Sequence, residues 1–195
     1  VVHSYPPRRS SDLSFGAENF VALVVPAGNY EKESRLLQEL DARPEIDHSQ
    51  GLANTEAMDG YMLTDKLTAR DFSELLEIDY EIAELLYTAY AVNDENYAKI
   101  INGFSNYSIP LIDIFMFLYD EVDEGYVTLD DDLMETLEDA HTKMQIALDQ
   151  LQGEEYSRML IYLTLPEEGD ETFAFLDEMH EIAGKYYDKS EVLVP

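Results

Sequence analysis

Histidine is the side chain best suited to acid–base catalysis and zinc binding near neutral pH. The chain has four, at His3, His48, His141 and His180, and no two stand at a metal-ligand spacing. It also lacks the sequence patterns of a zinc-protease helix, a nucleophile elbow, a phosphate loop and a dinucleotide-binding loop. There is no cysteine for disulfides, thiol catalysis or thiolate-bound metal. We therefore expect no catalytic residue, no cofactor-binding residue and no metal ligand, and a chain that is not an enzyme.

Carboxylates dominate the charge, with 42 acidic residues against 12 basic ones and a net charge of −30. Residues 120–124 and 130–132 form two acidic clusters, and their oxygens are ligands that calcium prefers. Neither cluster has the spacing of an EF-hand loop, so a solvated acidic surface is the better interpretation. That surface repels the phosphates of nucleic acids and of anionic lipids, and we expect no nucleic acid partner.

Tyrosine is frequent, with 14 residues, and tryptophan is absent. A tyrosine buries a large ring and keeps a polar tip at the edge of a packed layer. Packing at the boundary of thin helical layers is the favoured interpretation, and a contact surface for a partner or an amphipathic ligand is the alternative. The tyrosines concerned lie in the middle of the chain: Tyr80, Tyr87, Tyr90, Tyr97, Tyr107 and Tyr119.

The two ends of the chain have the pattern of alternating strands and helices. Residues 20–25 are a short β-branched run that predicts a buried strand. Asn29 is a suitable N-cap for a helix over residues 30–42, and residues 45–52 favour a weaker strand. Near the other end, we expect a strand over residues 156–165 and a helix over 172–187 that places Phe173 and His180 on its apolar side. Residues 192–194 predict a last strand.

Helical periods dominate the middle of the chain. Thr68, Asp79 and Asp130 are suitable caps for helices over residues 69–76, 80–90 and 131–152, and further helices are expected over 93–103 and 109–123. The helix after Asp79 is expected to bury Ile82 and Leu85. The apolar positions of the helix over 131–152 alternate three and four apart, which suits either an antiparallel partner helix or a helix lying on its own domain. The apolar run over 109–119 is interrupted by Asp113 and is too short to span a membrane, so we expect a core helix.

This order of elements is β-α-β, a long insertion, then β-α-β. It predicts an α+β fold, a ferredoxin-like split βαβ sandwich with a large all-helical insertion between its two halves. The two helices of the halves are expected to cover one face of the sheet. The corresponding divisions are a linker over residues 1–14, a first half over 15–53, the insertion over 54–153 and a second half over 154–195. The strand-like ending and the missing initiator Met are typical of a segment taken from a longer polypeptide.

Specific residues in the two halves also resemble a known family. They are Val-Val-Pro-Ala-Gly-Asn at 24–29, Ser-Gln-Gly-Leu at 49–52, Glu-Tyr-Ser-Arg-Met at 155–159 and Ile-Ala-Gly-Lys-Tyr-Tyr at 182–187. Together they resemble the extracytoplasmic, porter-type loop domain of bacterial exporters of the RND superfamily, in its MMPL-like branch and of the Firmicutes type. These are framework residues and include no catalytic signature.

The resemblance implies a function for the longer protein. It would be a proton-driven exporter in the bacterial cell membrane, with this domain on the extracytoplasmic side. The domain would form part of the export route for hydrophobic, amphipathic or lipid-like substrates, or a docking surface for partners. The implied partners are the transmembrane helices and the second extracytoplasmic loop of the same polypeptide, a second copy of the chain, or an accessory protein. The family's proton-relay residues lie in membrane helices that this chain does not contain.

Two other readings of the residues stay open. A bacterial surface module could bind a protein partner through the helical insertion, and a sensor domain could use the same frame for a small molecule.

Overall fold

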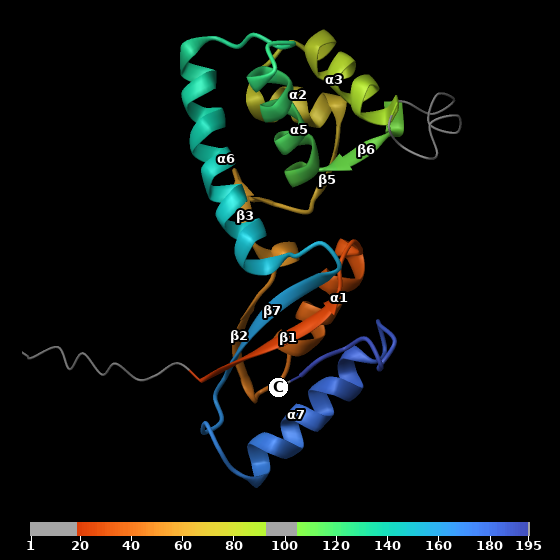
Figure 1. Cartoon of the computed structure of the whole chain (residues 1–195), viewed down its shortest axis with the longest axis vertical. Coiled ribbons are helices and arrows are strands. Elements are labelled where there is room, and N and C mark those ends of the chain that lie inside the picture. The colour runs from red at the N-terminus through yellow and green to blue at the C-terminus, as the bar shows by residue number, and fades with distance from the viewer. Residues whose placement is uncertain (1–18, 93–104, 195) are drawn as a thin grey trace, which may run out of the picture.

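Residues 19–92 and 105–194 are described by the computed structural model of the protein, which has two lobes (Figure 1). The sheet lobe contains three strands and two helices contributed by both ends of the described chain. The helical lobe contains the elements between them. The α+β class is confirmed. The expected linker over residues 1–14 and the expected helix over 93–103 lie outside the described residues.

The sheet lobe is built on β1 (Phe20–Pro26), β7 (Tyr156–Leu163) and β2 (Ile46–Gln50), in the antiparallel order β1-β7-β2. Leu23 faces Met159 across the first pair, and Ser49 faces Ile161 across the second. Successive residues of β7 alternate between buried and more exposed positions, as the two-residue period of a strand requires. The strands expected over residues 20–25, 45–52 and 156–165 are therefore present.

One face of this sheet is covered by α1 (Tyr30–Asp41) and α7 (Asp170–Ala183), as expected. Leu36, Leu37 and Leu40 of α1 and Phe175 and Met179 of α7 share one buried cluster with the inward residues of the strands. Each such side chain contributes about 1.5–3 kcal/mol by leaving water. The expected cap is also present, since the Asn29 side chain accepts a hydrogen bond from the Lys32 backbone N–H at 3.0 Å.

The last expected strand is reduced to one residue pair. Leu193 and Val24 exchange two backbone hydrogen bonds of 2.9 Å each, which places the C-terminal segment on the free edge of β1. Leu193 leaves 60% of its surface exposed, whereas Val192 is buried in the core of the sheet lobe and Val194 packs against that core.

The helical lobe begins with the short helix η1 (Leu52–Asn54) and ends with α6 (Asp131–Leu151), the long helix at the upper left of Figure 1. Its other helices are α2 (Ala69–Leu76), α3 (Tyr80–Val92) and α5 (Leu111–Asp123). The caps at Thr68 and Asp130 are as expected, with Thr68 and Asp71 forming a capping box.

The expectation that this insertion is all-helical is wrong. It contains the ladder β3 (Glu56–Met58) with β4 (Tyr61–Met62), and the ladder β5 (Lys66–Thr68) with β6 (Ser108–Pro110). The helix expected from residue 109 therefore starts at Leu111. Ile109 precedes a proline, which disfavours helical backbone and leaves Ile109 free to pair with Leu67.

Two helix faces also differ from the expectation. In α3 the buried residues are Ala83, Leu86, Tyr87 and Ala91, whereas Leu85 is 71% exposed. Tyr87 sets this rotation, because its hydroxyl donates to the Leu67 carbonyl at 2.9 Å.

In α7, Phe173 is exposed and Phe175 packs in the core instead, while His180 is half-buried. This helix runs from Asp170 to Ala183, whereas the expected range was 172–187. It therefore starts two residues earlier and ends four residues earlier than expected. Gly184 caps its end by donating to the His180 carbonyl at 3.0 Å.

Helix α6 packs against its own chain, including the preceding helix α5. It buries Leu137, Met144 and Leu151, and its contacts are with α5, β7 and η1. No helix within residues 19–92 and 105–194 is long and apolar enough to cross a membrane.

A buried carboxylate fixes the junction where the chain leaves the sheet lobe. Glu33 is 2% exposed, and its Oε1 accepts a hydrogen bond from the Ala53 backbone N–H at 3.0 Å. Burial raises the pKa of Glu33, and the N–H groups of Ala53 and Leu52 partly oppose that rise. Ser157 faces the same carboxylate, although its hydroxyl does not meet hydrogen-bond geometry. Gly51 leaves the space that this arrangement needs.

We expect the substitution Gly51→Ala to reduce the free energy of unfolding by about 1–3 kcal/mol. The added methyl carbon would stand 2.9 Å from Leu37 Cδ1 and 3.0 Å from Glu33 Oε1. Gly153→Ala is the matched control, because the nearest atom there is 3.5 Å away. Urea unfolding of the three proteins measures the difference, and equal midpoints for the two variants would contradict the role of Gly51.

Candidate binding cleft between the lobes

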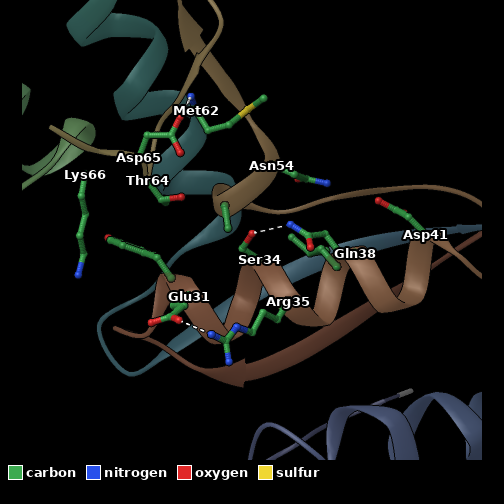
Figure 2. A pocket seen from close by; sticks show the side chains of 13 residues that line it. Glu31, Ser34, Arg35, Gln38, Asp41, Asn54, Met62, Thr64, Asp65 and Lys66 are labelled. Carbon is green, nitrogen blue, oxygen red and sulfur yellow. Dashed lines mark hydrogen bonds and ion pairs between the residues drawn. The ribbon is translucent and has the colours of Figure 1, made fainter. Parts of the chain in front are cut away.

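Two cavities open where the sheet lobe meets the helical lobe. The larger, of about 620 Å³, lies between α1 and residues 62–66 (Figure 2). The smaller, of about 410 Å³, lies between the start of α1 and the segment containing β6 and the start of α5. Tyr30, Glu31 and Lys66 line both cavities, so the two are neighbouring parts of one interlobe cleft.

Tyr30 connects the lobes at the middle of this cleft. It is the first residue of α1, and its ring packs against the core of the helical lobe. Its hydroxyl donates to Gln152 Oε1, just after α6, at 3.3 Å. Burial, followed by the charge of Asp113, raises the pKa of Tyr30 to about 12. The phenol therefore stays neutral and remains a donor at physiological pH.

Lys66 reaches the cleft from β5, which α5 holds in place. The backbone N–H of Leu111 donates to the Asp65 carbonyl at 2.8 Å, and that of Ile112 donates to the Leu63 carbonyl at 2.8 Å. The Asp65 carboxylate in turn accepts from the Met62 backbone N–H at 2.8 Å. These bonds fix the position of the backbone from which the Lys66 side chain extends.

The wall of the larger cavity on α1 is polar and internally paired. Figure 2 shows Glu31 bonded to Arg35, and Ser34 bonded to Gln38, each pair one helical turn apart. The Glu31–Arg35 pair is exposed and contributes less than about 1 kcal/mol. This part of the cleft is a solvated groove with few side chains left to hold a ligand.

The smaller cavity contains the more unusual group, Asp113 in the first turn of α5. The side chain is half-buried, and burial raises its pKa from an ordinary 3.8 to about 6. Among the described residues, no hydrogen-bond donor or cation is paired with this carboxylate. Tyr90 and Tyr107 line the same cavity with Tyr30. The arrangement is suited to binding and offers no nucleophile–base pair for catalysis.

The structure does not bring the histidines together. His48 stacks on Tyr162 at the exposed face of the sheet, with ring centroids 4.1 Å apart. His141 stacks on Tyr119 between α6 and α5, and His180 bonds to the Lys189 carbonyl at 3.0 Å. His3 lies outside the described residues.

The acidic clusters form no cation site in the described part of the chain. Within residues 19–92 and 105–194, no group of three or more potential metal ligands comes together. Asp120, Glu124 and residues 130–132 are exposed, which agrees with a solvated acidic surface.

The tyrosines of the helical lobe divide between both interpretations offered by the sequence. Tyr87 is buried, and Tyr119 packs against the core, so these two follow the packing interpretation. Tyr90 and Tyr107 also line the cleft. Tyr97 lies outside the described residues.

Sequence reasoning did not identify Tyr30 or Asp113 as site residues. A signal for Asp113 was present, because it is the charge that interrupts the apolar run over 109–119.

Comparison with known proteins finds no counterpart: no protein-family model, no curated protein and no solved structure matches this chain. Its function therefore has to be inferred from its own residues and their geometry.

We expect Asp113→Asn to stabilise the protein by about 1–3 kcal/mol at pH 7.5, because a neutral amide avoids the cost of a buried charge. The raised pKa means that the folded protein binds this proton more tightly than the unfolded chain. The stability that Asp113 contributes is therefore fully present below pH 3.8 and is lost as the pH rises to about 6. The Asp113→Asn variant should not show this loss of stability between pH 3.8 and about 6.

Urea unfolding between pH 4 and 8 measures the difference between the variant and the original protein. Asp120→Asn, an exposed change on the same helix, is the control and should leave the stability unchanged. A constant difference across this pH range would contradict the assignment.

Proposed function

We propose that this chain is an extracytoplasmic domain of a proton-driven bacterial exporter, of the RND-superfamily, MMPL-like kind. In this proposal it forms part of the export route for hydrophobic, amphipathic or lipid-like substrates, or a docking surface for partner proteins. The sheet lobe is the ferredoxin-like split βαβ unit, and the helical lobe is its insertion. The proton-carrying residues belong to membrane helices of the longer protein.

The order of strands supports the fold part of the proposal. Counting the C-terminal segment, the sheet runs from Leu193 to β1, β7 and β2. This is the arrangement in which the two βαβ halves interleave, with α1 and α7 on one face. The residues that carry the family resemblance lie in this lobe: Val24 and Val25 in β1, residues 156–159 in β7, and residues 182–187 at the end of α7.

The positions of the two ends of the described chain support the proposed function. The chain enters the sheet at Phe20, and β1 runs from there toward the helical lobe. The Val24–Leu193 pairing is antiparallel, so the C-terminal segment runs back toward the start of β1. The described chain therefore begins and ends in the sheet lobe, with its last residues beside β1 (Figure 1). A domain inserted between two neighbouring membrane helices needs this geometry.

The helical lobe would then project furthest from the membrane. Between residues 54 and 153, the described part of this lobe has 21 carboxylates. It has only three basic side chains, Lys66, Arg70 and Lys143. Such a surface is repelled by anionic lipid head groups and stays in solvent.

A surface interaction module is the second candidate. It is favoured by the outer face of α3, where Ile82, Leu85 and Val92 are exposed at 37%, 71% and 58%. Exposed apolar side chains at helical spacing are a common feature of protein contacts. This candidate predicts a longer protein with a single membrane anchor.

The proposal predicts the location of both lobes in the full-length protein. The chain has no cysteine, so single cysteines can be introduced by Glu168→Cys in the sheet lobe and Glu135→Cys in the helical lobe. In a cysteine-free full-length protein, both positions should react with a membrane-impermeant maleimide in intact cells. The protein should also remain in carbonate-washed membranes, with an apolar span of about 20 residues on each side of this domain.

Labelling that requires cell lysis would refute the extracytoplasmic location. A longer protein with one anchor would refute the exporter and favour the surface module.

A further inference from the structure

We propose that the smaller cavity of the interlobe cleft binds small organic cations through an ammonium group, with Asp113 as the counter-charge and tyrosine rings as the walls. This inference goes beyond export and does not depend on it, because it rests on the described residues of the cavity alone.

The carboxylate is the first part of the site. Asp113 lies in the first turn of α5, half-buried, and it lines a cavity of about 410 Å³. A half-buried carboxylate that has lost part of its hydration gains from a cation that replaces the lost water. Since no described residue pairs with Asp113, a ligand can supply that cation.

The aromatic walls are the second part. Tyr30, Tyr90 and Tyr107 line the cavity with Asp113. The negative face of an aromatic ring attracts an ammonium group, and cages of such rings are a recurrent means of recognising quaternary amines. A cavity that combines tyrosine rings with the Asp113 carboxylate favours a cation that is also apolar over a hydrated metal ion.

Each wall is held in place by a contact outside the cavity. The Tyr30 hydroxyl is bonded to Gln152, the Tyr107 ring lies edge-on to Tyr87 at 6.4 Å between centroids, and the Tyr90 ring lies edge-on to Phe117 at 5.4 Å. The rings are therefore positioned before a ligand arrives, which lowers the entropy lost on binding.

The remaining charges around the cavity are Glu31 and Lys66. Glu31 is paired with Arg35. Lys66 is the opposing feature, because its ammonium lowers the affinity of the cavity for another cation. Figure 2 shows the Lys66 side chain extended away from Asp65. The Lys66 ammonium would compete with the ammonium group of a ligand for the Asp113 carboxylate.

The overall charge of the protein favours cations over anions at this site. A net charge of −30 raises the local concentration of cations and repels anions. The cavity volume is within the range of small-ligand sites and exceeds what one ammonium group needs.

Choline is a suitable probe, and 3,3-dimethylbutan-1-ol is its uncharged counterpart of the same shape. Calorimetric titration of the whole chain at pH 7.5 and constant ionic strength should show saturable binding of choline and at least about tenfold weaker binding of the alcohol. NMR shifts on choline addition should be concentrated at the tyrosines of the cavity.

Paired variants separate the site from general charge attraction. Asp113→Asn should weaken choline binding by at least about tenfold, whereas Asp120→Asn, with the same change of net charge, should not. Lys66→Met should strengthen binding, whereas Lys143→Met, a charge removal on α6, should not. Circular dichroism and urea unfolding check that each variant is folded.

Three results would overturn the proposal. One is equal binding of choline and its uncharged counterpart. Another is equal weakening by Asp113→Asn and Asp120→Asn, which would show charge attraction without a site. The third is saturable binding of inorganic phosphate that Lys66→Met abolishes, which would make this an anion site.

Discussion

The buried carboxyl group of Glu33 ties the start of the insertion to α1 of the sheet lobe. It lies under the sheet with 2% exposure and bonds to the backbone of η1, the first turn of chain beyond the sheet lobe. A charged group is buried at this cost only where backbone N–H groups and close packing compensate it. Gly51 leaves room for the carboxylate, and Leu37 packs beside it. The path of the insertion away from the sheet starts from this point.

The interlobe cleft follows from that junction. The chain crosses between the lobes twice, at η1 and between α6 and β7, and Tyr30 bridges them by its bond to Gln152 at the second crossing. The lobes keep separate apolar clusters, one around Leu23 and Met159 and one around Phe72 and Phe115. The space between them is lined by polar side chains and tyrosine rings together with a few apolar residues.

Charge is distributed in a way that suits both proposals. The carboxylates on the outside are solvated, and such an acidic surface would be repelled by anionic lipid head groups. Besides Glu33, Asp113 is an exception, because burial raises the pKa of its carboxyl to about 6 and the residue lines a cavity. In the two proposals, carboxylates would thus serve solubility at the surface and ligand recognition in the cleft.

The sequence by itself determined the local elements. Periodicity and capping, which act over a few residues, indicate strand β1, helix α1 with its Asn29 cap, the helix cap at Thr68, helix α6 and strand β7. It did not determine which side of α3 is buried, because the bond from Tyr87 to the Leu67 carbonyl depends on an element 20 residues away. It also missed the short ladder between β5 and β6, whose strands are about 40 residues apart.

The candidate site belongs to the tertiary structure for the same reason. The sequence showed Asp113 as one charge in an apolar run and Tyr30 as the start of a helix. Only packing of the two lobes places them in one cleft, because the contacts that do so join residues more than 80 positions apart, and no local pattern records such a distance.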